Sequence, residues 1–110
     1  MKETPKIYII KQITDHNGKA REDGRYPLRI GRRFAFGLGE PSPSMVMAIC
    51  YRPRQNDDYS GTLRTSIVQK VERIEEGTVV MTNKDKIFIF CKDGMIVTTK
   101  NSIYYFQEEE

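Results

Sequence analysis

Residues 77–106 decide the fold, because they contain one short pattern written twice. The run GTVVMT (77–82) followed by IFIF (87–90) is matched by GMIVTT (94–99) followed by IYYF (103–106). Each copy has two runs of β-branched or aromatic residues separated by a polar corner, which is typical of short strands joined by turns. Asp93-Gly94, between the copies, is a two-residue hairpin signal. This stretch therefore predicts a C-terminal antiparallel meander.

The first half of the chain contains further strand-like runs. Residues 6–14 are rich in β-branched and aromatic side chains, and a strong turn then opens an exposed loop over residues 15–25. Apolar side chains alternate strictly from Leu28 to Leu38, which predicts a half-buried strand with Arg32 as the one charge on its apolar face. Residues 45–51 are apolar on both faces and predict a central, buried strand.

Residues 62–75 leave two alternatives. Val68, Val71 and Ile74 recur at helical spacing, whereas alternate residues from Thr65 to Arg73 recur at strand spacing. We favour a strand, because β-branched residues dominate the segment and no helix cap precedes it. A single short helix is the alternative.

The chain as a whole predicts one small all-β domain. Its 110 residues allow a single hydrophobic core. About eight strands and several glycine bends indicate a small barrel or a strongly curled antiparallel sheet, in which closure removes exposed edges. We expect residues 5–107 to form the ordered core and residues 108–110, three glutamates, to form a solvated acidic tail.

Composition indicates a cytoplasmic protein. No window reaches the roughly 18 apolar residues of a membrane span, and the N-terminus lacks an apolar segment followed by a small-residue cleavage site. We therefore expect neither a membrane partner nor a secretory signal. Cys50 and Cys91 both lie in apolar runs, which favours two buried, reduced thiols over a disulfide.

The sequence offers little chemistry for catalysis. His16 is the one histidine, and it lies in a turn beside Asp15. Neither cysteine has a second thiol or a histidine at metal-binding spacing, and no phosphate-binding glycine motif is present. We expect a protein that is not an enzyme and that uses no metal or cofactor.

Arginine is the stronger functional signal. Residues 1–66 hold eight of the nine arginines and a net charge of +5, against +3 for the whole chain. A planar guanidinium suits bidentate contact with phosphate and stacks on bases. One cluster begins the predicted strand at Arg25 and Arg29, and another flanks the longest polar loop, which Pro53 stiffens. The predicted ligand-binding residues are Arg32, Arg33, Arg52, Arg54 and Arg64, with Tyr51 and Tyr59 as stacking surfaces. The alternative is that these arginines pair with acidic residues of their own loops, namely Glu22, Asp23, Asp57 and Asp58.

Two polar motifs carry a resemblance. An R-T-S-x-V element at 64–68 and a T-x-N-S-x-Y strand at 99–104 are similar to those of small β-barrel domains in uncharacterised bacterial and phage proteins, over residues 62–107. The resemblance implies a fold and a bacterial or phage setting, and it implies no activity. A tight bend at Asn101-Ser102, satisfying backbone groups, explains part of the second motif.

Two functions from different classes follow. The first is a non-enzymatic binding module for a phosphate-bearing ligand, either a nucleotide or single-stranded nucleic acid. The alternative is a protein-interaction module, such as a phage-encoded inhibitor of a host protein or an assembly component, which uses the same loops on a protein surface. A homo-oligomer is a further option.

Overall fold

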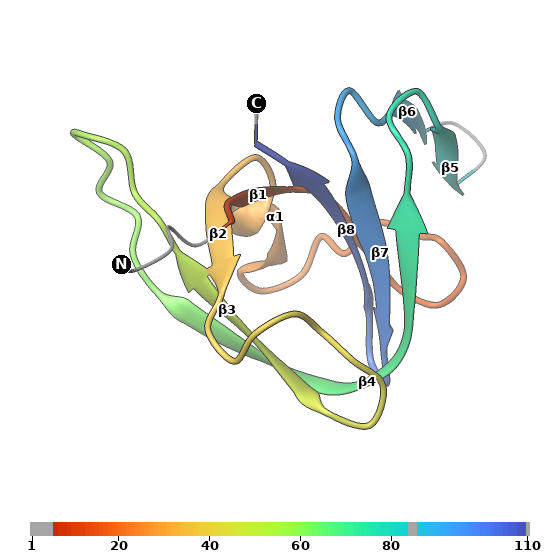
Figure 1. Cartoon of the computed structure of the whole chain (residues 1–110), viewed down its shortest axis with the longest axis horizontal. Helices are drawn as coiled ribbons and strands as arrows, with labels where there is room; N and C mark the ends of the chain where they lie inside the picture. Colours follow the sequence, from red (N-terminus) through yellow and green to blue (C-terminus); the bar gives the residue numbers. More distant parts are fainter. Residues whose placement is uncertain (1–5, 84–85, 110) are drawn as a thin grey trace.

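The computed structural model, which describes residues 6–83 and 86–109, is almost entirely β (Figure 1). The elements in chain order are β1 (Tyr8–Thr14), α1 (Tyr26–Arg29), β2 (Arg33–Phe36), β3 (Val46–Tyr51), β4 (Thr62–Ile74), β5 (Val79–Asn83), β6 (Lys86–Ile89), β7 (Gly94–Thr99) and β8 (Ile103–Glu108). Residues 1–5, where we expected no secretory signal, and Glu110 of the predicted tail lie outside the described residues.

Six strands close into an antiparallel barrel in the order β1-β2-β3-β4-β7-β8. β8 closes it by pairing with β1, from Tyr8 opposite Glu108 to Thr14 opposite Ile103. β4 is 13 residues long and pairs with β3 and then with β7. Three register shifts, in the β1–β8, β3–β4 and β4–β7 ladders, bend the strands as a closed sheet requires. The predicted small barrel is confirmed, and so is the choice of a strand for residues 62–75.

Only the second half of the meander predicted over residues 77–106 joins the barrel, where β7 pairs with β8 and with β4. The first half forms the hairpin β5–β6, a separate two-stranded sheet inserted between β4 and β7. The prediction that Asp93-Gly94 turns a hairpin is wrong, because Gly94 instead begins β7 opposite Ile74. A Cβ atom on Gly94 would lie 2.1 Å from the carbonyl oxygen of Phe106 and 2.7 Å from the Phe90 ring. Close packing, rather than a turn, requires glycine at this position.

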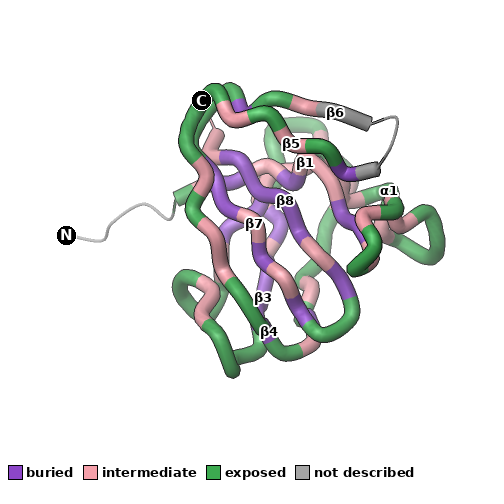
Figure 2. The backbone as a smooth tube through the Cα atoms, turned by 90° about the vertical axis from the view of Figure 1, so that its right-hand side faces the viewer, coloured by how far each residue is buried: buried purple, intermediate pink, exposed green. Residues whose placement is uncertain are grey.

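The barrel interior is filled by aromatic and branched side chains from all six strands, among them Tyr8, Ile13, Phe34, Ile49, Val97 and Phe106. Figure 2 shows that buried residues recur along the length of β7 and β8. Tyr104 and Tyr105 are both buried.

The hairpin packs beside the barrel through a second aromatic cluster. The Phe88 ring meets the Tyr105 ring edge-on at 5.8 Å, and Phe90 is fully buried. The opposite face of the hairpin presents Val79, Met81 and Ile89 to solvent.

The single strand predicted from Leu28 to Leu38 is wrong. The chain first forms the short helix α1, with Pro27 in its first turn, where a fixed φ and a missing N–H are tolerated. Gly31 then turns with a φ of 82°, and only the four residues of β2 continue in the sheet. As a result Leu28 and Leu38 are exposed, although the alternation pattern placed both of them on the apolar face.

Two further predictions need correction. Both thiols are free, but Cys50 is only half-buried and Cys91 is exposed, because Cys91 lies in the turn that follows the apolar strand β6. The predicted solvated tail is wrong for Glu108, which is part of β8 and pairs with Lys6, and for Glu109, which pairs with Arg33.

In the described part of the chain, no helix is long and apolar enough to cross a bilayer.

Candidate functional site

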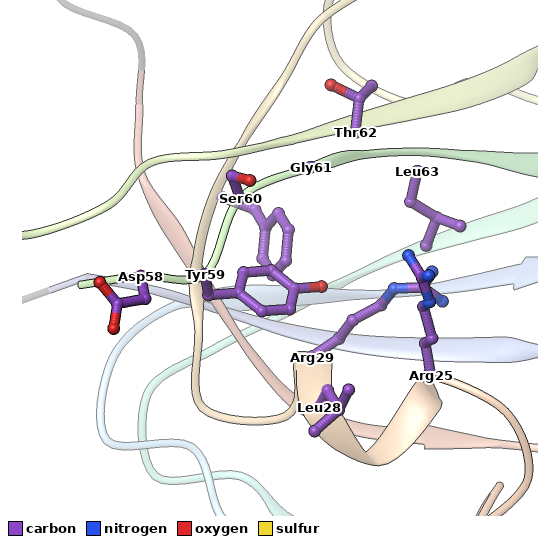
Figure 3. A pocket seen from close by; sticks show the side chains of 10 residues that line it. Arg25, Leu28, Arg29, Asp58, Tyr59, Ser60, Gly61, Thr62 and Leu63 are labelled. Atoms are coloured by element: carbon purple, nitrogen blue, oxygen red, sulfur yellow. The ribbon is translucent and has the colours of Figure 1, made fainter.

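A pocket of about 320 Å³ lies between α1 and residues 58–63, which lead into β4 (Figure 3). Arg25, Leu28 and Arg29 line it on the helix side, and Phe34 lines it from the barrel core. Its volume is at the lower end of the range for small-molecule sites. The sequence of α1 explains how the cations reach this pocket: Arg25 is the N-cap and Arg29 is the last helical residue, so both lie on one side of a single turn.

The two guanidinium groups converge without a counter-ion. Figure 3 shows the Arg25 and Arg29 side chains both reaching into the pocket below Leu63, while the carboxylate of Asp58 points away from them. Neither arginine forms an ion pair among residues 6–83 and 86–109. Two like charges that line one pocket repel each other, so an anion bound in the pocket would be stabilised by both.

A third arginine extends the positive region. The guanidinium carbons of Arg21 and Arg29 each lie 5.6 Å from the centre of the Tyr26 ring. Burial raises the pKa of the Tyr104 hydroxyl, and the positive charges of Arg29 and Arg21 act in the opposite direction. Arg21 and Arg29 therefore share the Tyr26 ring, and both act on the Tyr104 hydroxyl.

Tyr59 reaches the pocket from the long loop and is held on several sides. The Arg32 guanidinium lies 4.8 Å from the centre of its ring, and the Tyr51 ring meets it edge-on at 4.5 Å. Asp57 Oδ1 accepts the Tyr59 backbone N–H at 3.0 Å and Arg32 Nη1 at 3.1 Å. The Tyr59 hydroxyl points toward the guanidinium pair (Figure 3). One hydroxyl and two guanidinium groups thus face the same space.

The structure separates most of the site residues predicted from sequence. Of the predicted ligand-binding residues, only Tyr59 lines the pocket. The Arg32 guanidinium packs on the Tyr59 ring. Tyr51 is 6% exposed and belongs to the core, so it cannot stack on a ligand. Arg64 is exposed, but it follows Leu63, whose side chain points toward the pocket. Because side chains alternate along a strand, Arg64 lies on the outer face of β4.

Three other predicted residues hold the loop together. Arg33 and Arg54 both pair with Glu109, and Arg52 supplies its backbone carbonyl to Arg33. Arg33 and Arg54 therefore do pair with a carboxylate, as the alternative proposed. Their partner is Glu109, which follows β8, and not an acidic residue of their own loops. Arg32 pairs with Asp57, which that alternative named as a partner, but Asp57 lies in the other loop, 25 residues away.

The ligand-binding residues predicted from the sequence do not include Arg25 and Arg29, although both belong to an arginine cluster. A usable signal existed: the two arginines are four residues apart and flank Tyr26-Pro27, and proline favours the first turn of a helix.

Metal binding has no visible basis in the described chain. No group of three His, Cys, Asp or Glu side chains within residues 6–83 and 86–109 could hold an ion. His16 Nε2 donates a hydrogen bond to the carbonyl of Thr99 at 2.7 Å, which ties the first loop to the end of β7.

Comparison with protein-family models, curated proteins and solved structures finds no match. The ligand of the pocket therefore has to be inferred from the chemistry of the pocket itself.

Proposed function

We propose that this protein binds a phosphate-bearing ligand, a nucleotide or the end of a single-stranded nucleic acid, in the pocket between α1 and residues 58–63. The observation that supports this most is the pair of guanidinium groups of Arg25 and Arg29, which face one space without a carboxylate partner. The planar fork of arginine matches two oxygens of a phosphate.

The remaining walls suit the rest of such a ligand. Tyr59 directs a hydroxyl donor at the position that a phosphate would occupy. Leu28 and Leu63 add apolar surface, and Leu28 is 55% exposed although it is a large apolar side chain. A few convergent polar groups set among apolar walls are typical of small-molecule sites. An apolar sugar face or a base would cover this surface.

The same pocket supports binding without catalysis. Ser60 and Thr62 are the aliphatic hydroxyls in the lining, but the one histidine of the sequence, His16, is engaged with Thr99. The one lining carboxylate, Asp58, points away from the guanidinium pair. Activation of a nucleophile requires a base within hydrogen-bond reach, and these positions do not provide one. We place the protein in the cytoplasm, since an exposed free thiol at Cys91 suits a reducing compartment.

A thermal-shift screen tests the proposal. Nucleoside mono-, di- and triphosphates and short single-stranded oligonucleotides are added at low salt, because a ligand that binds only the folded state raises the Tm. We expect a rise with the wild-type protein and with Arg64→Ala, and none with Arg29→Ala. If no phosphate-bearing compound raises the Tm of the wild type, the proposal is wrong.

A second candidate function is protein interaction through the hairpin. Val79, Met81 and Ile89 form an exposed apolar row on the face of β5–β6 that is turned away from the barrel. Exposed apolar patches on small domains often mark interaction surfaces. Sedimentation of the wild type and of Met81→Lys would show whether this face joins two copies of the chain. An identical monomer mass for both proteins at high concentration would exclude self-association here.

A further inference from the structure

The pocket is closed at its inner end. Phe34, which lines it, is 2% exposed and belongs to the barrel core. Figure 3 shows the half-buried Leu63 side chain above the ends of Arg25 and Arg29. A phosphate that reaches Arg25 and Arg29 must therefore enter from solvent, with the remainder of the ligand trailing outward past the exposed Leu28.

The pocket holds more hydrogen-bond donors than a phosphodiester has terminal oxygens. Each guanidinium can direct two N–H groups from one edge, and Tyr59 adds one O–H, which makes about five donors. A phosphomonoester offers three terminal oxygens and a charge of roughly −1.5 to −2 near neutral pH. A phosphodiester offers two such oxygens and a single negative charge.

We infer that the pocket binds a terminal phosphomonoester in preference to an internal phosphodiester. This inference rests on the proposed function and gives it a narrower ligand class. The two cations of Arg25 and Arg29 match the two negative charges of the monoester, whereas a diester carries one, and the monoester offers a third terminal oxygen to the donors. Free nucleotides and 5′-phosphorylated oligonucleotide ends share this chemistry.

Four probes separate the classes when each is titrated calorimetrically into the full chain at low salt. The first two are a nucleoside 5′-monophosphate and the 3′,5′-cyclic phosphodiester of the same nucleoside. The other two are one short single-stranded oligonucleotide with and without a 5′-phosphate. We expect each monoester to bind at least about tenfold more tightly than its diester counterpart, which corresponds to about 1.4 kcal/mol. Comparison of the two monoesters identifies which source the pocket accommodates better.

Two controls test the mechanism. Arg29→Gln removes one of the two positive charges, so the preference for monoesters should fall by about tenfold, whereas Arg64→Gln on the outer face should leave it unchanged. Lowering the pH from about 7.5 to about 5 should weaken monoester binding alone, because the second proton of a phosphomonoester binds with a pKa near 6.

The outcomes distinguish a failure of the phosphomonoester inference from a failure of the proposed phosphate binding. Equal affinity for monoester and diester, with both lost in Arg29→Ala, would overturn the inference and leave phosphate binding in place. Absence of binding by all four probes would overturn both. A monoester preference that persists unchanged in Arg29→Gln would also contradict the inference, because the two cations would then not be its source.

Discussion

The Arg33 guanidinium donates two hydrogen bonds to the Glu109 carboxylate, from Nε to Oε1 at 2.6 Å and from Nη2 to Oε2 at 2.9 Å. Arg54 Nη2 donates to the same Oε1 at 2.6 Å, and Arg33 Nη1 donates to the carbonyl of Arg52 at 3.1 Å. These contacts join β2, the chain beyond β8 and the loop after β3. Arginines that the sequence marked for a ligand thus anchor the loop that carries Tyr59.

This ion pair should stabilise the fold in a pH-dependent manner. The hydrogen bond from Arg33, followed by that from Arg54, lowers the pKa of Glu109 to about 2. Glu109→Gln should reduce the free energy of unfolding by about 1 kcal/mol at pH 7, measured by urea denaturation. Because the pKa is lower in the folded state, the stabilisation is complete above the ordinary carboxyl pKa and is lost as the pH falls toward 2.

A neighbouring pair provides the control for this prediction. Glu108 bonds to Lys6, whose side chain is 58% exposed, so Glu108→Gln should cost less than Glu109→Gln. A difference between wild type and Glu109→Gln that stayed constant between pH 7 and pH 2 would contradict the assignment.

The contact between the first loop and the hairpin depends on Gly18. Both Gly18 and Gly31 have a φ of +82°, but a Cβ atom on Gly18 would lie 2.2 Å from the carbonyl oxygen of Thr82, whereas Gly31 has open space. Gly31→Ala should therefore cost about 1 kcal/mol from backbone strain, and Gly18→Ala should cost about 1–3 kcal/mol more from the clash. Thermal denaturation of the two variants measures the difference, and equal losses would show that the loop does not press on β5.

The two cysteines should differ in reactivity. Cys91 is exposed and Cys50 is half-buried on β3. A thiol reagent should label Cys91 quickly in the native protein and Cys50 only slowly, because the reagent must reach the sulfur to react with it. Mass spectrometry of Cys50→Ser and Cys91→Ser assigns the labels. Rapid labelling of Cys91→Ser in its native state would show that Cys50 is accessible.

The elements predicted correctly from the sequence are those with local signals. The β-branched density of residues 62–74 selected a strand over a helix, and the runs at 94–99 and 103–106 form β7 and β8. The alternation from Leu28 to Leu38 failed because one helical turn and one glycine turn can carry the same spacing as a strand. Pro27 was the local sign of the helix.

The site was less predictable because its parts meet only through the closed barrel. Arg29 and Tyr59 are thirty residues apart, and they face each other because β2, β3 and β4 pair in sequence. The partner of Arg33 is likewise distant: Glu109 belongs to a run of three glutamates that composition alone describes as solvated. Clusters of arginine in the sequence therefore do not show which of them are neutralised in the fold.

The most direct measurement is a calorimetric titration of a nucleoside 5′-monophosphate into four proteins at low salt: the wild type, Arg25→Ala, Arg29→Ala and Arg64→Ala. Arg25 and Arg29 form no ion pair in the described chain, so their replacement should leave the Tm nearly unchanged while weakening binding by about tenfold or more each. Arg64→Ala should bind like the wild type. A wild-type protein that binds no monophosphate, or one that loses as much affinity from Arg64→Ala as from Arg29→Ala, would contradict the assignment of this pocket.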